Sequence, residues 1–426
     1  MPGKKLWFWT VVVILALSVV FGGCGKKTEQ TPGKTKITYM YAGGTTNDEI
    51  IKKATALFRE ENPEIEVELI YVPDWGTYVD KIATSIASNT APDVIALGVY
   101  QIGDFVRKNA VLELSDYIAG DKEFQERKKD IFPATLWDSI TFEQGVFGIP
   151  AWQNPDVLYY NKNLFDSGGV AYPDETWDYE RFLKEAQKLT KRKNGKTQQF
   201  GTWGLGWYWN YLWAYGADAL NRDATKCLLD SPEAIAAIQY KTDLSEKYRV
   251  APNLGESSDQ TDYQAFMTGK VATFVSGHYM VPMLKEIKDF DWDIAPLPHG
   301  KKRETLNNVI YWLVLRSSKM PEAAWEYVKF LSGPQVQKLI VESENDVPIL
   351  RSVMDSKLFM NPNVPPASDD IYVKSLAHSR PFPIEMDTRI DGIIWNAMAS
   401  VNLGKKTVKE ALIEATGEIN HHLQER

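Results

Sequence analysis

Three stretches decide the fold class of this chain: ITYMYA (37–42), IEVELIY (65–71) and DVIAL (93–97). In the first two, apolar and polar residues alternate as they do along a strand, and the third is a short apolar run typical of a buried strand. Apolar residues at helical spacing separate them, over 50–58 and again over 79–86. This order predicts an α/β fold whose parallel sheet is covered on both faces, with a ligand-binding edge beyond the carboxyl ends of the strands.

The rest of the chain continues this style less regularly. Pro321 is suited to the first position of a helix, and Thr407 and Glu410 form a capping-box sequence before another apolar helical face. Further patterns predict strands over 157–161, 271–276 and 309–316, and helices over 179–191, 280–288 and 321–331. The length of 426 residues suggests two or three domains, or one large two-lobed body.

The composition argues against several classes of function. A formal net charge of −8 makes nucleic acid a poor candidate for a partner. Two cysteines cannot build a disulfide framework, and Cys227 is predicted to be a small core or surface residue. The five histidines show no HExxH spacing, and the sequence contains no CxxC, P-loop or GxSxG motif. We therefore predict no metal, no cofactor and no catalytic residue.

The first 24 residues have the pattern of an export signal. Two lysines precede an uncharged apolar stretch over 6–20, and Gly-Gly-Cys follows at 22–24. The apolar stretch is shorter than the roughly 20 residues that span a bilayer, which disfavours the alternative of an uncleaved anchor. The Gly-Gly-Cys ending resembles a bacterial lipobox, which implies removal of 1–23 and lipidation of Cys24. Residues 24–36 read as a flexible linker, so the chain is predicted to be extracytoplasmic, tethered to the cell membrane or periplasmic.

An aromatic cluster lies between Trp203 and Tyr215, where seven of the 13 residues in WGLGWYWNYLWAY are Trp or Tyr. Two glycines near its start are unusual in a buried helix, so our hypothesis is a loop and helix start that present aromatic faces to a ligand. Sugar rings stack on such faces, and no Arg or Lys gathers here to recognise an anion. The cluster favours a neutral, ring-shaped solute; the alternative is a well-packed core segment.

Six motifs, in order along the chain, resemble those of the extracellular sugar-binding proteins of bacterial ABC importers, the maltose-binding-protein-like group. The resemblance runs with gaps from about residue 36 to 423. Its strongest part, over 147–165, resembles the first hinge crossing of that family and the strand after it. The motifs are FREENPEIEVE (58–68), APDVIAL (91–97), FGIPAWQNPDVLYYNKNLF (147–165), FMTGKVATFVSGHYM (266–280), PEAAWEYVKFLSGPQVQ (321–337) and GKKTVKEAL (404–412).

The resemblance implies two α/β lobes joined by crossing strands, which close on a solute about a hinge. It places lobe one at 36–148 and 299–331, and lobe two at 149–298 and 332–426. Composition alone would give two successive domains, so the interleaving comes from the resemblance.

The resemblance also implies ligand contacts from both lobes. Loops after the first three strands contribute from lobe one, the hinge motif supplies two amides, and the aromatic cluster and SGHYM supply rings from lobe two. Trp325 and Trp395 lie on apolar helical faces and are predicted to be core, and Trp177 to be structural. The predicted substrate contacts are Asp74, Trp75, Tyr100, Gln101, Gln153, Asn154, Trp207, Trp209, His278, Tyr279 and Trp312.

These observations predict a monomeric receptor, not an enzyme, that captures an oligosaccharide with high affinity and delivers it to the permease of an ABC transporter. A sugar that bridges both lobes binds the closed form better, and the transporter recognises that form. Two alternatives stay open. One is a surface glycoside hydrolase, whose paired carboxylates leave no spacing signature. The other is the same receptor class with a polyamine or glycerol phosphate as solute.

Overall fold

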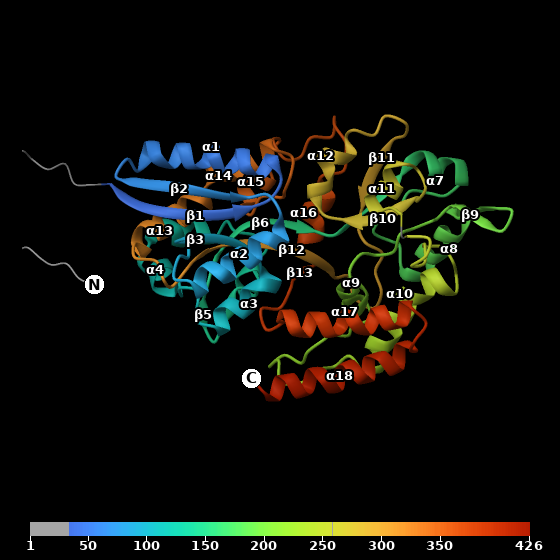
Figure 1. Cartoon of the computed structure of the whole chain (residues 1–426). Helices are drawn as coiled ribbons and strands as arrows, with labels where there is room; N and C mark the ends of the chain where they lie inside the picture. Colours follow the sequence, from blue (N-terminus) through green and yellow to red (C-terminus); the bar gives the residue numbers. More distant parts are fainter. Residues whose placement is uncertain (1–33, 258) are drawn as a thin grey trace, which may run out of the picture.

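The computed structural model describes residues 34–257 and 259–426 (Figure 1). The predicted signal peptide, Cys24 and the linker up to residue 33 lie outside the described residues. Within the two described ranges, no helix combines the length and the apolar character needed to span a bilayer. The chain forms two main sheets with helices around each, and we call these halves the first lobe and the second lobe.

The first lobe is built on the three strands predicted from the N-terminal segment. β1 (Thr35–Ala42) is parallel to β2 (Ile65–Val72) on one side and to β3 (Val94–Gly98) on the other. A strand from far along the chain, β12 (Thr305–Val314), pairs with β3 on one edge and with β6 (Ile149–Pro155) on the other, antiparallel in both cases. The predicted parallel sheet is therefore confirmed, and three further strands extend it: β12, β6 and β13 (Ser379–Pro381), which pairs with the start of β12.

Helices cover both faces of this sheet. On one face α1 (Thr45–Glu61) packs with α13 (Pro321–Leu331) and α14 (Pro334–Glu342), and on the other lie α2 (Trp75–Ala87) and α3 (Val99–Arg107) (Figure 1). The face of α1 that is buried carries the apolar residues predicted at helical spacing. The α/β fold expected from the sequence is confirmed.

The segment after α13 also packs in the first lobe. Gln335 Nε2 of α14 donates a hydrogen bond to Glu61 of α1 at 2.8 Å, and Arg351 N donates to Asp130 O at 2.8 Å. Residues 334–354 therefore lie with the larger sheet, whereas the resemblance places them in the second lobe. The shorter elements of the first lobe are α4 (Ser115–Gly120), α5 (Lys122–Lys128), α6 (Thr135–Asp138), β4 (Thr141–Phe142), β5 (Gly145–Val146) and α15 (Arg351–Met354).

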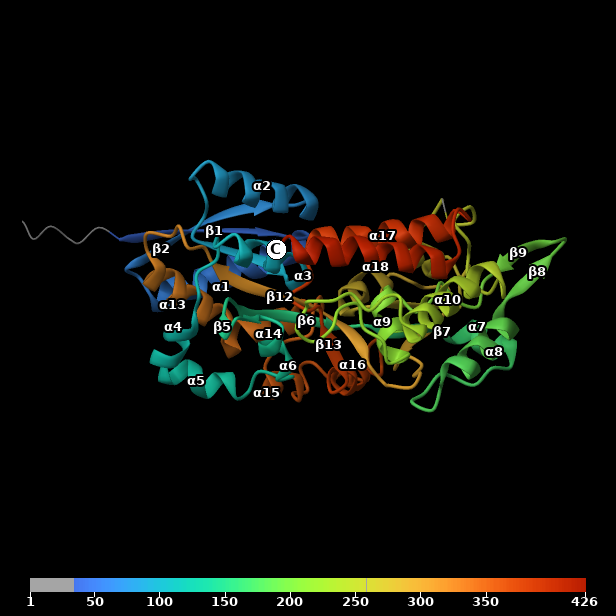
Figure 2. The same cartoon turned by 90° about the horizontal axis from the view of Figure 1, so that it is seen from below.

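The sheet of the second lobe is antiparallel. β7 (Val157–Asn161) lies between β10 (Thr273–Ser276) and β11 (Trp292–Ala295), and it begins directly after the chain leaves β6. β13 (Ser379–Pro381) pairs with the first residues of β12 and returns the chain to the junction of the lobes. The remaining elements are α7 (Lys162–Gly168), α8 (Tyr179–Leu189), β8 (Lys191–Lys193), β9 (Lys196–Gln199), α9 (Tyr208–Ala214), α10 (Pro232–Glu246), α11 (Asp262–Met267), η1 (His278–Met280), α12 (Val281–Leu284), α16 (Asp370–Leu376), α17 (Thr388–Asn402) and α18 (Val408–Gln424). α17 and α18 pack along each other (Figures 1 and 2).

Most predicted elements of this half are confirmed, although several bounds differ. β10 begins at Thr273 instead of 271, α8 ends at Leu189 instead of 191, and β12 covers Thr305–Val314 instead of 309–316. β7 and α13 have the predicted bounds, and Thr407 caps α18 with the reciprocal Glu410 contact of a capping box. The helix predicted over 280–288 ends at Leu284, because the indole of Trp292 donates to the Leu284 carbonyl at 3.1 Å and satisfies the helix end.

A tyrosine hydroxyl that stabilises the first sheet provides a test of this fold. The Tyr78 hydroxyl donates to Ala96 O at 2.8 Å and accepts from Ala96 N at 2.9 Å, with no exposure to water. Tyr78→Phe should lower the free energy of unfolding by about 1–3 kcal/mol in urea denaturation, since buried backbone groups lose their partner. Tyr172→Phe, which removes a surface hydroxyl bonded to Asp166, should change it by less than about 0.5 kcal/mol. Equal effects of the two changes would contradict the assignment.

Candidate functional site

A row of aromatic rings passes from the first lobe to the second. Trp75 Nε1, at the start of α2, donates to the Tyr100 hydroxyl of α3 at 3.2 Å. The ring centroids of Tyr100 and Phe382 are 5.6 Å apart, those of Phe382 and Trp207 are 5.4 Å apart, and those of Trp207 and Trp395 are 5.8 Å apart. We call these five residues the aromatic row. Trp207 and Trp395 are 37% and 42% exposed, so the second-lobe end of the row offers free ring surface.

Two tyrosines fold back over glycines at the ends of strands. Gly98 ends β3 and Gly277 follows β10. A Cβ atom at Gly98 would lie 2.6 Å from Tyr100 Cε1, and one at Gly277 would lie 2.7 Å from Tyr279 Cε1. Only glycine accommodates rings this close. Both lobes therefore contain a Gly-X-Tyr sequence that places a tyrosine ring against the end of a strand.

A pocket of about 250 Å³ opens beside Trp207 in the second lobe. It combines ring faces with carboxyl, ammonium and hydroxyl groups, a mixture that suits a polar ligand with apolar faces. Tyr279 contributes a ring that is 40% exposed. The side chains that line the pocket include Asp156, Trp207, Tyr211, Lys241, Asp262 and Tyr279.

Asp156 is the buried carboxyl group of this pocket, at the point where β6 passes into β7. Its carboxylate oxygens accept hydrogen bonds from Asn210 Nδ2 at 2.8 Å and from Asn308 Nδ2 at 3.3 Å. Burial raises the pKa of Asp156 to about 7, although the hydrogen bond from Asn210 acts in the opposite direction. At neutral pH this carboxyl group is therefore present in both its protonated and its ionised form.

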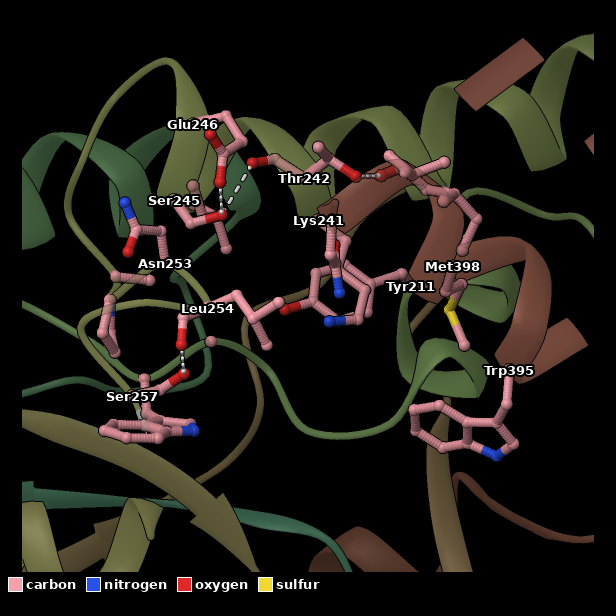
Figure 3. Close-up of a pocket in the computed structure, with 18 residues that line it drawn as sticks. Tyr211, Lys241, Thr242, Ser245, Glu246, Asn253, Leu254, Ser257, Trp395 and Met398 are labelled. Carbon is pink, nitrogen blue, oxygen red and sulfur yellow. Dashed lines mark hydrogen bonds between the residues drawn. The ribbon is translucent and has the colours of Figure 1, made fainter. Parts of the chain in front are cut away.

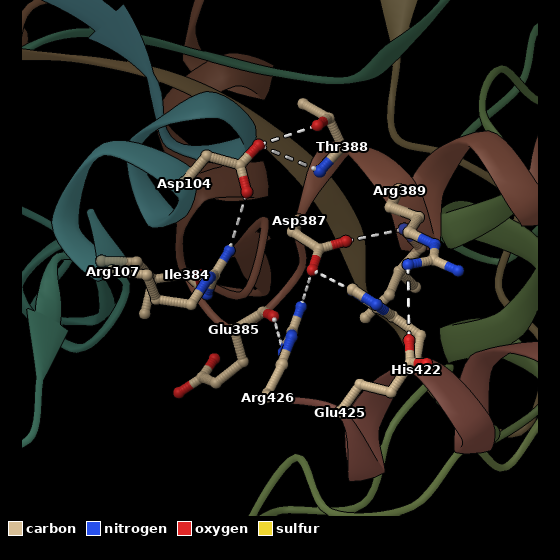
Figure 4. Close-up of polar contacts among 11 residues, drawn as sticks. Asp104, Arg107, Ile384, Glu385, Asp387, Thr388, Arg389, His422, Glu425 and Arg426 are labelled. Carbon is tan, nitrogen blue, oxygen red and sulfur yellow. Dashed lines mark hydrogen bonds and ion pairs between the residues drawn. The ribbon is translucent and has the colours of Figure 1, made fainter.

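Polar groups also join the lobes where α3 meets the start of α17 (Figure 4). Asp104 Oδ2 accepts from Thr388 Oγ1 at 2.8 Å and from the Thr388 N–H at 3.3 Å. One residue earlier, Asp387 accepts from His422 Nε2 at 2.7 Å and from Arg426. Burial alone would raise the pKa of Asp387, but these hydrogen bonds lower it to about 2. The ionised Asp387 therefore ties the end of α18 to the start of α17.

Comparison with known proteins places the chain in a family. The model of the bacterial extracellular solute-binding protein family matches residues 42–338. This chain belongs to that family. The matched range includes the strands of both sheets except β1 and β13, and the pocket beside Trp207.

Relatives of this solute-binding protein match it over nearly the whole chain. A relative in Brucella abortus, named only as a binding protein, is 25% identical over 96% of this chain and 97% of its own length. A maltooligosaccharide ABC transporter solute-binding lipoprotein of Streptococcus pneumoniae is 24% identical over 96% of this chain and 95% of its own.

Solved structures share the two-lobed fold. The ABC substrate-binding protein of Listeria monocytogenes, solved with cycloalternan, has a TM-score of 0.82 and 24% identity, over 92% of this chain and 99% of that one. The GacH receptor of Streptomyces glaucescens, solved unliganded and with acarbose, has a TM-score of 0.77 and 22% identity, over the same shares of the two chains. At these identities the likeness establishes the fold of the solute-binding protein.

Two predicted contacts, Gln153 and Asn154, lie in the hinge of the solute-binding protein. Gln153 is fully buried; its Nε2 donates to Phe132 O at 2.7 Å and its Oε1 accepts from Asn307 Nδ2 at 2.9 Å. Asn154 Nδ2 donates to Asp346 Oδ1 at 2.6 Å. These amides hold the crossing strands together, so Gln153 offers no surface to a ligand in this conformation.

Three other predicted contacts are buried in the core. Trp312 Nε1 donates to the Tyr39 hydroxyl at 3.1 Å, and Trp209 is likewise fully buried. His278 packs against Tyr372 with ring centroids 4.8 Å apart, and burial lowers the pKa of His278 to about 4. The expectation that Trp209 and Trp312 face a ligand is not met in this conformation, because α9 and β12 turn these rings inward.

The aromatic cluster over 203–215 divides into two parts. Every residue of α9 is buried, so the alternative of a core segment is correct for the helix. The preceding loop instead places Trp203 and Trp207 in the wall of the pocket, as the hypothesis of ligand-facing rings requires. Residues predicted to be structural and found buried are Trp177, Trp325 and Cys227.

Asp74 and Gln101 lie at the starts of helices. Asp74 is exposed and caps α2, since its Oδ1 accepts from Thr77 N at 2.8 Å. Gln101, in the first turn of α3, is nearly buried, and its Oε1 has no partner among the described residues. Trp75 and Tyr100, predicted with them, form the first-lobe end of the aromatic row. In the described part of the chain, no group of three or more His, Cys, Asp or Glu side chains could hold a metal ion.

Three residues of the site were missed or misassigned from the sequence. Trp395 was predicted to be core, but it stands at the edge of α17 beside Trp207 with much of its ring exposed. Phe382 follows a strand of three residues, too short to produce a pattern. Asp156 could have been identified, because it is the one acidic residue between the two apolar strands of the hinge motif.

The raised pKa of Asp156 predicts a pH dependence of stability. The pKa of Asp156 is about 7 in the folded protein and near 4 in the unfolded chain. Its protonated form therefore contributes its full stabilisation below about pH 4, and this contribution to the free energy of unfolding is lost as the pH rises to about 7. Relative to Asp156→Asn, the wild-type protein should therefore lose stability between pH 4 and 7, by an amount of the order of 4 kcal/mol. Urea denaturation at several pH values across this range gives the free energy of unfolding of both proteins. The test compares how steeply the two free energies change with pH, so a constant difference in stability between the proteins does not affect it.

The control is Asp74→Asn, which changes an exposed carboxyl group whose pKa is lowered by its hydrogen bonds to Thr77. Its stability should run parallel to that of the wild type from pH 4 to 7. Parallel curves for Asp156→Asn and the wild type would show that folding does not raise the pKa of Asp156.

Proposed function

We propose that this protein captures an oligosaccharide outside the cytoplasm and delivers it to the permease of an ABC importer. The aromatic row carries the proposal, because rings from both lobes meet beside a pocket that also holds carboxyl and hydroxyl groups. Sugar rings stack their C–H faces on Trp and Tyr, while their hydroxyls bond to planar polar groups. Membership of the solute-binding family supports capture of a solute.

The ligands named for similar proteins support the sugar class. The relative in Streptococcus pneumoniae is named for maltooligosaccharides, and another, in Bacillus subtilis, for maltodextrin. Structures similar to this one in fold include complexes with cycloalternan and with acarbose. Each of these ligands contains several rings. The aromatic row is longer than one sugar ring, so its length suits such a ligand.

Closure of the two lobes is the proposed mechanism. Trp75 and Tyr100 approach the ligand from the first lobe, and Trp207 and Tyr279 from the second. A sugar that touches both sides has a higher affinity for the closed arrangement, and it shifts the population toward that arrangement by this difference in affinity. The importer then recognises the closed form. Asp74, Gln101, Asn154 and His278 remain proposed as secondary contacts.

We assign the lobes by the sheets on which the segments pack. The first lobe would contain residues 36–148 and 306–354, and the second 157–304 and 370–426 apart from β13, which pairs with β12. β6, β13 and the segment 355–369 would then form the connections between the lobes. This division follows the packing of α14 and α15 on the first lobe.

We further propose that the protein is a monomer without catalytic activity, anchored by lipid chains on Cys24. A relative is named as a lipoprotein, and each buried methylene of an acyl chain adds about 0.8 kcal/mol of membrane affinity. Catalysis would require a carboxyl group free to act on a glycosidic bond, whereas Asp156 is held by Asn210 and Asn308.

Substitution of an exposed ring tests the sugar site. Calorimetric titration of the purified protein with maltotriose, mannotriose and cycloalternan should find binding, and a reducing-sugar assay should find no hydrolysis. Tyr279→Ala should then weaken that binding by about 1–3 kcal/mol, because a stacked ring is lost. Trp207→Ala should act in the same direction.

Tyr172→Ala is the matched control, since Tyr172 is 37% exposed and Tyr279 is 40% exposed. Tyr172 lies against Tyr160 and Phe165, away from the aromatic row. Its substitution should leave sugar affinity unchanged. If Tyr279→Ala and Tyr172→Ala bind alike while both remain folded, the proposed site is wrong.

A further inference from the structure

A second cavity, of about 210 Å³, lies in the second lobe and shares part of its wall with the pocket beside Trp207. Figure 3 shows the residues that line it. It is bounded by α10, by α17 and by the loop around Asn253. Figure 3 shows Lys241 and Tyr211 side by side in the middle of this cavity, with Trp395 at one end. The residues that line both cavities are Trp203, Gly204, Tyr211 and Lys241.

The ammonium group of Lys241 has no anionic partner in the described part of the chain. Lys241 forms no ion pair within 4.0 Å and no hydrogen bond with a described residue. Its Nζ lies over the ring of Tyr211, 5.6 Å from the ring centroid. The side chain is partly buried, and this burial lowers the pKa of Lys241. Withdrawing an ammonium group from water is unfavourable unless an anion or hydrogen-bond acceptor compensates, so a negatively charged ligand group would compensate for the partial burial of Lys241.

The carboxyl groups in the walls of the two cavities have partners of their own. Asp156 accepts from two asparagine amides, as described above. Asp262 Oδ1 accepts from Tyr263 N at 2.8 Å, and Glu246 Oε1 accepts from Ser245 Oγ at 3.5 Å. None of the three lies within ion-pair distance of Lys241. The charge of Lys241 therefore remains available to a ligand.

We propose that the oligosaccharide bound by this protein ends in a uronate ring, whose carboxylate pairs with Lys241 at the wall shared by the two cavities. This inference rests on the proposed function and specifies the class of sugar. It departs from the expectation of a wholly neutral solute, which was drawn from an aromatic cluster that does not contain Lys241.

The chemistry of the cavities favours a carboxylate over a phosphate. A single ammonium matches the single charge of a carboxylate, whereas a phosphate carries nearly two charges and is usually held by several donors. No arginine lines either cavity among the described residues. The rings of Trp203 and Trp395 supply flat apolar faces for the sugar ring that bears the carboxylate.

Matched pairs of trisaccharides test the inference. Isothermal titration calorimetry of the full chain in detergent would compare β-1,4-mannotriose with trimannuronate, cellotriose with its triuronate, and α-1,4-galactotriose with trigalacturonate. Mannotriose with a terminal 6-phosphate is a further probe. We expect the uronate to bind at least tenfold more tightly than its neutral partner in at least one pair, and more tightly than the phosphate. Lys241→Met should abolish that preference.

Lys247→Met is the matched control, because Lys247 follows the same helix and lies on a tyrosine ring, 5.0 Å from the centroid of Tyr248, at the surface. It should keep the preference, as should Lys241→Arg. Thermal unfolding checks each variant, and Lys241→Gln replaces Lys241→Met if the latter does not fold. The inference is overturned if neutral sugars or the phosphate bind as tightly as uronates, or if the preference survives in Lys241→Met. If only neutral sugars bind, the uronate inference is wrong and the proposed function is retained. If no sugar binds, the uronate inference and the proposed function are both wrong.

Discussion

The constraint on which the rest of the structure depends is the burial of amide and carboxyl side chains where the two lobes join. Asn307 Nδ2 donates to Gln153 Oε1 at 2.9 Å, and Asn307 Oδ1 accepts from the backbone of Asn154 at 3.1 Å. The backbone N–H of Asp156 donates to Leu306 O at 2.8 Å. A buried polar group left unpaired costs about 1–3 kcal/mol, so each of these groups fixes the position of its partner. The crossing strands β6 and β12 are thereby held in one register.

That register determines which strand ends face each other. The aromatic residues of the site follow directly after these strand ends. β3 pairs with β12 and ends in Gly98, over which Tyr100 folds; β10 pairs with β7 and leads to Tyr279 in the same way. β13, at the other end of β12, delivers Phe382 between Tyr100 and Trp207. Phe382 is nearly buried and contacts rings of both lobes, so it supports the row while its neighbours keep free faces.

The sequence predicts what depends on local periodicity and misses what depends on the packing of distant segments. Helical spacing identified the buried face of α1, and alternation identified the first strands, because these patterns arise within one element. A tryptophan gives no such signal, because the same indole ring can pack in the core or stack on a ligand. Trp209 and Trp395 were therefore assigned to opposite environments from those found, and only the turn of α9 into the core and the position of α17 at the junction distinguish them. Trp75 and Trp207 stand at the starts of helices, where the sequence predicted ligand contacts, and their contact with a ligand stays a prediction.

The energetics of the junction support the proposed closure of the lobes on a ligand. The contacts of Asp104 with Thr388 are partly open to water, and exposed polar contacts of this kind contribute little net stability. At the other side, Lys285 pairs with Glu344 at 2.6 Å, again at the surface. The free faces of Trp207, Tyr279 and Trp395 are apolar surface that the protein alone leaves in water. Covering apolar surface contributes roughly 25 cal/mol per Å². In the proposed mechanism, a ring-shaped solute would therefore stabilise the closed form by covering the ring faces that the polar contacts leave open.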